Sequence, residues 1–294
     1  MERTGGKNKV EAREVKRIGE EQLWLGEGPV WDSVGKVLYY VDIEGKKIGC
    51  YNPRTEAHTF LKTEKMPGCI VPDEDGNLIA AEENILVCVN PSTGEREIIA
   101  ALDIPEGLRF NDGKCDCKGR MWVGTMAIDQ SAPYAKGCGS LYCCKEGKTA
   151  AVLSGMSIPN GIAFSPDNRT MYHIDTPTRQ IDSYDFDPET GRISNKKTAV
   201  RIDRDGNPDG MAIDCEGMLW VALWGGYGVA RYNPQNGRLL ELVPVPDRNV
   251  SCCTFGGENG DVLYITTAMD EDGNGGYLYE WKAGVKGPAP YRFR

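Results

Sequence analysis

The chain has 294 residues, a formal net charge of −9 and a pI of about 5.0. This length can bury a large core without disulfides, and the acidic balance argues against nucleic acid or an anionic membrane surface as a partner. No apolar run approaches the ~18 residues of a membrane-spanning helix, and residues 1–20 are charged and lack the apolar stretch of a secretory signal.

Short strands separated by tight turns follow one another along the chain. After a charged tail at residues 1–13, which we expect to fray, residues 15–23 are available as an outer strand for the last repeat. Proline and glycine occupy the turns, where proline presets φ and glycine accepts a positive φ. The strands expected next lie at residues 37–41, 47–51, 58–61, 78–81, 85–89 and 96–99.

Four strands recur every roughly 40 to 50 residues, which is the repeat length of β-propeller blades. The sequence therefore predicts an all-β fold, a six-bladed β-propeller of four-stranded antiparallel blades, forming one domain over residues 14–294. The N-terminal strand is expected to close the last blade. The six units are anchored at Gly28, Gly68, Asp112, Gly161, Gly210 and about Cys252.

A polar residue recurs at one register in four of these units. Glu27 and Asn160 each lie twelve residues before an aromatic residue of the following strand, and Asn111 and Asp209 lie eleven residues before one. In a propeller, residues just before the inner strand of each blade meet at one mouth of the central channel. We therefore expect these four side chains to surround a common site.

Two carboxylates and two amide carbonyls form an oxygen-rich cluster. The carboxylates would raise each other's pKa unless a cation compensates their charge. Oxygen ligands favour one divalent cation, Ca²⁺ first, with Mg²⁺ or Mn²⁺ as alternatives and Zn²⁺ or Fe²⁺ less suited. Other acidic residues follow four or more positions later, and we expect them to bond backbone amides of the next turn. These are Asp32, Asp116, Asp167 and Asp214.

The cysteines and histidines offer little catalytic chemistry. Eleven cysteines, an odd number with two adjacent pairs, are typical of free thiols and predict a cytoplasmic protein. Of the two histidines, His58 is expected to be solvated and His173 to be packed. No Gly-x-Ser-x-Gly motif accompanies them, so a Ser-His-Asp triad is not expected.

Longer motifs are more specific than this register. They read LGEGPVW at 25–31, RFNDGK at 109–114, GTMA at 124–127, IPNG at 158–161, PDGM at 208–211 and VKGPAPY at 285–291. In this order they resemble the regucalcin/gluconolactonase family, also called the senescence marker protein and luciferin-regenerating enzyme family. The resemblance extends over nearly the whole chain.

The resemblance implies a lactonase that hydrolyses sugar lactones, such as gluconolactone, with one divalent metal ion at the channel mouth. It implies Glu27, Asn160 and Asp209 as metal ligands. The metal would polarise the lactone carbonyl or a bound water, and Asp209 would be the general base.

The family pattern also implies residues that contact the substrate. Arg109 and Asn111 match two of them, so Asn111 is reassigned from ligand to substrate contact. Asp129 matches a third, where animal relatives carry a glutamate, one methylene longer. The loop 130–137 resembles a lid, and its composition leaves the preferred lactone open.

Two alternatives remain at this stage. In the first, the chain is a non-enzymatic, calcium-binding regulatory propeller. In the second, it is a lactonase or esterase with a different substrate range. Arg109 and Asp129 favour an enzyme, because a purely structural metal needs neither. A paraoxonase-like site is disfavoured because both histidines lie outside the four-residue register. The sequence does not fix the oligomeric state, the metal or the pathway.

Overall fold

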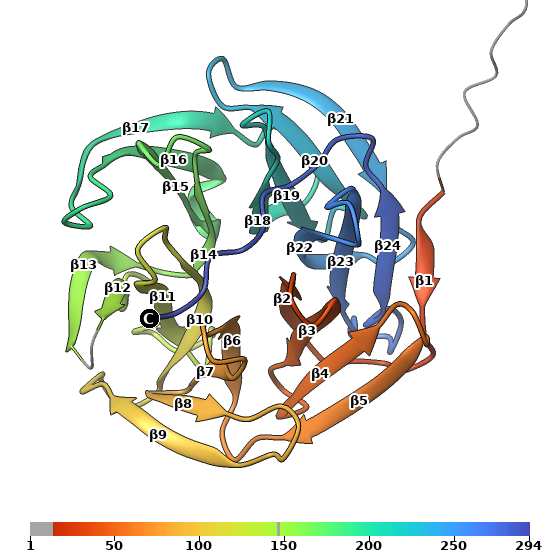
Figure 1. Cartoon of the computed structure of the whole chain (residues 1–294). Coiled ribbons are helices and arrows are strands. Elements are labelled where there is room, and N and C mark those ends of the chain that lie inside the picture. Colours follow the sequence, from red (N-terminus) through yellow and green to blue (C-terminus); the bar gives the residue numbers. More distant parts are fainter. Residues whose placement is uncertain (1–13, 146–147) are drawn as a thin grey trace, which may run out of the picture.

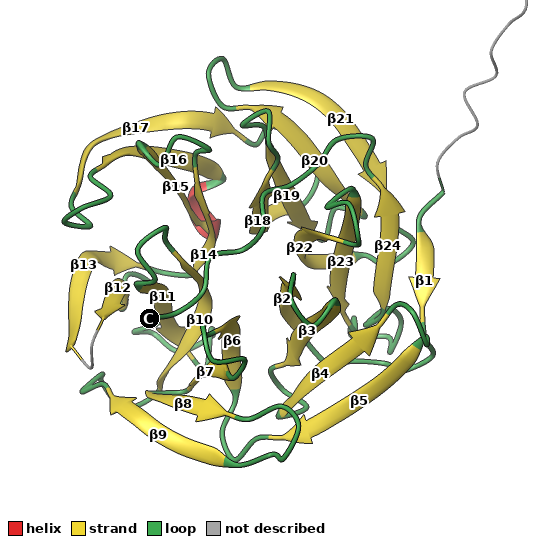
Figure 2. Ribbon diagram, viewed as in Figure 1, coloured by secondary structure: helices red, strands yellow, loops and turns green. Residues whose placement is uncertain are grey.

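The computed structural model describes residues 14–145 and 148–294, so the predicted tail at 1–13 lies outside the described residues. The strands form sheets arranged around a common centre, and loops join them at both faces (Figures 1 and 2). The one helix in the described ranges is a short 3₁₀ turn, η1 (Thr176–Thr178), and no helix there is long and apolar enough to cross a membrane. The predicted all-β fold of four-stranded antiparallel sheets is confirmed.

Four sheets each contain four consecutive antiparallel strands. The first holds β2 (Gly26–Asp32), β3 (Val37–Asp42), β4 (Lys47–Asn52) and β5 (Ala57–Lys62). The second holds β6 (Pro67–Pro72), β7 (Leu78–Glu82), β8 (Ile85–Val89) and β9 (Arg96–Ala101). The third holds β10 (Leu108–Cys115), β11 (Met121–Ala127), β12 (Gly139–Lys145) and β13 (Lys148–Met156). The fourth holds β14 (Pro159–Phe164), β15 (Thr170–Asp175), β16 (Gln180–Phe186) and β17 (Ile193–Arg201).

A larger sheet of eight strands completes the arrangement. One half holds β18 (Asn207–Ile213), β19 (Leu219–Trp224), β20 (Gly228–Asn233) and β21 (Arg238–Pro244). The other half holds β22 (Asn249–Gly256), β23 (Val262–Ala268), β24 (Leu278–Lys282) and β1 (Lys16–Ile18). A single pairing, Trp224 with Asn249, joins the two halves. The first strand, β1, lies antiparallel to the last strand, β24, in this sheet.

The core lies between neighbouring sheets. The innermost strands β6 and β14 are buried along their whole length, whereas most residues of the outer strands β5 and β17 are half-buried or exposed. Buried residues from β15, β16, β18, β19 and β20 form one cluster, which joins one sheet to the next. Apolar burial of this kind fixes each sheet against its neighbours and so fixes the strands that surround the centre.

Each of the six innermost strands contains a β-bulge near its beginning. A bulge disrupts the ladder and redirects the side chains beside it. The bulges lie between Glu27 and Val30, Pro67 and Cys69, Phe110 and Gly113, Asn160 and Ile162, Pro208 and Met211, and Val250 and Cys252. The register predicted from the sequence therefore coincides with a recurrent irregularity that re-aims the polar side chains.

Glycine next to the bulge allows neighbouring inner strands to approach closely. A Cβ atom on Gly210 would lie 2.2 Å from Sγ and 2.8 Å from Cα of Cys252 in the adjacent strand. A Cβ on Gly161 would lie 2.8 Å from the carbonyl oxygen of Asp209. Side chains do not fit at these positions, which explains why glycine follows Asn160 and Asp209 in the sequence.

The last ten residues, 285–294, form a C-terminal strap that crosses one face of the molecule (Figure 1). Backbone bonds join Lys286 to Cys215 (2.7 Å) and Gly287 to Gly260 (2.9 Å). Further contacts reach the turns after the other four innermost strands: Arg292 with Asp32, Phe293 with Pro72, Arg294 with Gly119, and Tyr291 with Asn168. Because these turns follow the inner strands, the strap lies at the end of the channel opposite to the predicted site.

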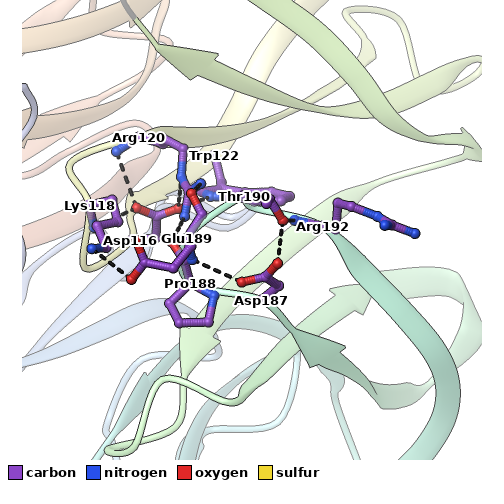
Figure 3. A network of polar contacts seen from close by, with 9 residues as sticks. All are labelled: Asp116, Lys118, Arg120, Trp122, Asp187, Pro188, Glu189, Thr190 and Arg192. Atoms are coloured by element: carbon purple, nitrogen blue, oxygen red, sulfur yellow. Dashed lines mark hydrogen bonds and ion pairs between the residues drawn. The ribbon is translucent and has the colours of Figure 1, made fainter.

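The predicted turn aspartates bond backbone amides as expected. Asp32, Asp116, Asp167 and Asp214 each accept at least one amide two residues ahead, which confirms the prediction for all four. Asp116 does more, since it also accepts from Arg120 Nε (2.6 Å) and Trp122 Nε1 (2.9 Å). Arg120 in turn donates to the carbonyl of Pro188, which ties the β10–β11 turn to the β16–β17 turn of the next sheet (Figure 3).

Candidate active site at the channel mouth

The structure brings the predicted ligands and two of the three predicted substrate contacts into one cavity. Its volume is about 410 Å³, and its lining includes the five residues Glu27, Arg109, Asn111, Asn160 and Asp209. Each of them is only 5–7% exposed. They come from β2, β10, β14 and β18, so four separate sheet regions contribute to a single site.

A chain of hydrogen bonds runs around the cavity from β10 to β18. Arg109 Nη1 donates to Asn111 Oδ1 (2.8 Å), and Asn111 Nδ2 donates to Asn160 Oδ1 (2.6 Å). Asn160 Nδ2 then donates to Thr176 Oγ1 (2.8 Å), whose hydroxyl donates to the carbonyl of Pro208 (2.8 Å). The chain ends next to Asp209 and fixes the two amides and the guanidinium in one orientation.

The two carboxylates of the cavity repel each other in a buried setting. Burial, and then the charge of Asp112, raise the pKa of Glu27. Burial, and then the charge of Glu27, raise the pKa of Asp209 well above its ordinary range. Arg109 acts in the opposite direction on both, while burial lowers its own pKa to about 10. The single positive charge of Arg109 therefore does not neutralise the carboxylates around it.

Asp112 adds a third buried carboxylate behind the cavity. It is 6% exposed and accepts a hydrogen bond from the amide of Gly113 (2.8 Å). It lines a second, smaller cavity of about 80 Å³ that lies under the C-terminal strap and also contains Lys114. From the sequence, Asp112 is identified only as the anchor of one unit and not as part of a site, although it follows Asn111 directly.

Glu27, Asn160 and Asp209 are the residues of the cavity that suit a hard cation. Among the described residues, no three side chains of the types histidine, cysteine, aspartate and glutamate gather as a metal site. A site here therefore depends on the amide oxygen of Asn160 together with two carboxylates. Oxygen donors of this kind match Ca²⁺ and Mg²⁺ rather than softer metals.

Asp129 lies apart from the other predicted site residues. Its side chain is exposed, and its carboxylate accepts from the amide (2.9 Å) and the hydroxyl (2.6 Å) of Ser131, which lowers its pKa. Its neighbours Ile128 and Gln130 line the cavity, whereas Asp129 does not. Substrate contact by Asp129 therefore stays a prediction, and it requires the loop to turn.

Residues that the sequence analysis did not single out complete the rim. They follow or end the second strand of a sheet, because antiparallel pairing returns that strand to the mouth where the inner strand begins. No common residue type marks these positions, and only their place after the second strand could have revealed them. They are Glu44, Thr176 and Trp224, together with Asn207 at the start of β18. Gln130, the first residue of the predicted lid loop, also lines the cavity.

Comparison with known proteins finds relatives over nearly the whole chain. Residues 25–269 match the family model described as SMP-30/Gluconolactonase/LRE-like region. Regucalcin of Danio rerio is 35% identical over 95% of this chain and 98% of its own length. A Bacillus subtilis protein with the name "Putative sugar lactone lactonase" is 35% identical over 84% of both chains. A crystal structure described as a calcium-binding protein, regucalcin, from Agrobacterium tumefaciens has a TM-score of 0.89 at 28% identity, covering 96% of this chain and 98% of that one. The chain therefore belongs to the SMP-30/gluconolactonase/LRE-like family.

Proposed function

We propose that the protein hydrolyses sugar lactones with the help of one divalent cation held by Glu27, Asn160 and Asp209. The observation that carries this proposal is the presence of two buried carboxylates and a buried guanidinium on the wall of one cavity. The carboxylates can hold a cation, and Arg109 can hold a polar substrate beside it. The names of the family and of the Bacillus subtilis relative support a lactone as that substrate.

The residues present fit such a cation. In the described part of the chain, the amide of Gly28 is the one hydrogen-bond donor recorded for the Glu27 carboxylate (2.8 Å). Burial, and then the charges of Glu27 and Asp112, raise the pKa of Asp209. Positive charge between Glu27 and Asp209 relieves this repulsion and keeps both ionised. Ca²⁺ suits the oxygen donors best, with Mg²⁺, Mn²⁺, Zn²⁺ and Fe²⁺ as alternatives.

The reaction needs little more than this. A lactone is an ester, so water can attack its carbonyl carbon directly, without a covalent intermediate on the protein. When bound, the cation supplies Lewis acidity to the lactone carbonyl and lowers the pKa of water. Asp209 accepts the proton that the attacking water loses. The carbonyl carbon then gains the water oxygen and its bond to the ring oxygen breaks. The ring oxygen takes up the proton held by Asp209, which leaves a hydroxy acid.

The remaining polar residues position the substrate. Both hydrogen bonds recorded for the Arg109 guanidinium use Nη1, with the carbonyl of Phe110 and Oδ1 of Asn111 as acceptors. Its orientation is thus fixed, and it can donate to a substrate oxygen through its other nitrogens. Asn111 supports the ligand Asn160 directly by the 2.6 Å bond between their amides.

We also propose a blade number and a cellular location for the protein. Counting the two halves of the eight-stranded sheet as separate blades gives six blades in one domain over residues 14–294. All eleven cysteines in the described ranges are free thiols, which supports a cytoplasmic location.

Metal content and thermal stability test the proposal together. We expect the purified protein to carry about one divalent cation per chain, and its Tm to fall after chelation and recover on adding Ca²⁺. Asp209→Asn should lose this response and slow the hydrolysis of D-glucono-δ-lactone at least about 100-fold. Glu258→Gln is the matched control, since Glu258 is exposed in the β22–β23 turn at the other end of an inner strand. Metal binding without turnover of any lactone would instead identify a calcium-binding regulator.

A further inference from the structure

Glu44 stands at the rim of the cavity on a turn that the fold holds rigidly. The turn joins β3 to β4, and the buried Asp42 fixes it by accepting the amides of Gly45 (3.0 Å) and Leu25 (3.0 Å). The amide of Ile43 donates to the carbonyl of Leu25 (3.0 Å), which binds the same turn to the start of β2. Both Ile43 and Leu25 line the cavity beside Glu44. Hydrogen bonds from Ile43 and Gly45, on either side of Glu44, therefore fix the backbone of this turn beside the cavity.

The carboxylate of Glu44 has no protein partner in residues 14–145 and 148–294, where no hydrogen bond or ion pair to it is recorded. The neighbouring cation Lys47 is engaged elsewhere. Its ammonium bonds Glu21 (2.8 Å), lies 3.7 Å from Asp42, and sits over the ring of Phe60. A carboxylate on a rigid turn, with the nearby lysine already bound to other acids, is free to accept a hydrogen bond from a ligand.

Glu44 and Arg109 face the same cavity with opposite charges. The charge of Glu44 is among those that favour the protonated guanidinium of Arg109, although the two groups are not within ion-pair distance. A hydroxyl group suits the space between such a pair, because it donates to a carboxylate and accepts from a guanidinium at once. An alkyl group offers neither interaction.

Glu44 is also distinct among the residues of the rim. The cavity has three acidic lining residues, and the other two, Glu27 and Asp209, belong to the proposed metal site. The wall near the rim is otherwise apolar or neutral, with Ile43, Ile128 and Gln130. Asp129, the acid expected to recognise substrate hydroxyls, is bonded to Ser131 instead.

We propose that Glu44 is a specificity-determining residue that accepts a hydrogen bond from a substrate hydroxyl remote from the lactone carbonyl. The site then selects polyhydroxylated lactones over unsubstituted alkyl lactones. This inference rests on the proposed function, because it names the substrate class of the same cavity.

Two substrates and three variants test it. D-glucono-δ-lactone carries ring hydroxyls, and δ-valerolactone has the same ring without them. We expect Glu44→Leu to lower kcat/KM for the hydroxylated lactone by about 10- to 100-fold, mainly through KM, and to leave δ-valerolactone within about twofold. Glu44→Asp should retain part of the selectivity, and Glu258→Gln, an equal change of charge at the opposite end of an inner strand, should change neither rate.

A binding measurement gives a second readout that does not depend on turnover. The lactam analogue of gluconolactone should bind about 10-fold more weakly to Glu44→Leu than to the native protein, whereas δ-valerolactam should bind both equally. Equal losses for both ring types, or no loss for either, would overturn the inference while leaving the lactonase proposal intact. A native protein that hydrolyses neither lactone contradicts the proposed function itself, and with it the inference.

Discussion

The buried histidine of β15 should make stability depend on pH in a predictable way. His173 is 1% exposed, and its Nε2 atom has no hydrogen-bond partner among the described residues. Burial lowers its pKa to about 3, and the charge of Lys196 acts in the same direction. In the unfolded chain a histidine has its ordinary pKa of about 6.5. We therefore compare the unfolding of the native protein with that of His173→Gln.

The sign and size follow from linkage. Between pH 6.5 and about 3 the unfolded chain binds a proton at His173 that the folded protein does not, so folded stability falls as the pH falls. At pH 5.0 the unfolded pKa lies about 1.5 units above the pH, which corresponds to a loss of about 2 kcal/mol. Above pH 7 the contribution vanishes. The group is fully buried, so solvent screening does not reduce the effect.

Urea unfolding at pH 7.5, 6.0 and 5.0 measures this directly. His173→Gln changes stability at every pH, but its free energy of unfolding should decline about 2 kcal/mol less than that of the native protein between pH 7.5 and 5.0. Burial also lowers the pKa of His58, and acidic groups titrate as well, but these contributions are common to both proteins. Parallel pH profiles for the two proteins would show that burial does not suppress the protonation of His173 in the folded protein.

Three further predictions concern the architecture around the site. Gly210→Ala should cost about 1–3 kcal/mol of stability in urea unfolding and lower the proposed lactonase activity, because its Cβ meets Cys252 beside the proposed ligand Asp209. Unchanged stability contradicts the close approach. Deleting residues 285–294 should lower Tm by roughly 5 °C or more and increase thiol labelling of Cys252, which lines the cavity under the strap. An unaltered labelling rate would mean that the strap does not cover this cavity. Asp116→Ala should cost about 3–5 kcal/mol, since it leaves Arg120 buried without its carboxylate, and a loss below about 1 kcal/mol contradicts this role.

Much of the site was predictable because the inner strands are equivalent. One register placed Glu27, Asn111, Asn160 and Asp209 together, and the structure has them in one cavity. The recurring strand order likewise predicted the four-stranded antiparallel sheets. Repetition makes such a prediction possible. The strand and turn that position one residue recur in the other sheets, where they position its counterparts.

What the sequence did not reveal depends on local contacts that do not repeat. The carboxylate of Asp129 accepts a hydrogen bond from the hydroxyl of Ser131, and the spacing of the strands does not predict that bond. Glu44 follows β3 on a loop outside the register of the inner strands, and its acidic counterpart two residues after β11, Asp129, does not line the cavity. His58 was expected to be solvated, yet it is half-buried against Tyr51, at 4.7 Å between ring centres, with Tyr40 Oη 3.3 Å from Nδ1.

We propose above that a cation held by Glu27, Asn160 and Asp209 enables lactone hydrolysis. The most direct measurement is the rate of D-glucono-δ-lactone hydrolysis, above the spontaneous rate, as Ca²⁺ is added to metal-free native protein and to Asp209→Asn. We expect a saturable rise to full activity in the native protein and no rise in the variant. A cation-independent rate that is equal in the two proteins would contradict it.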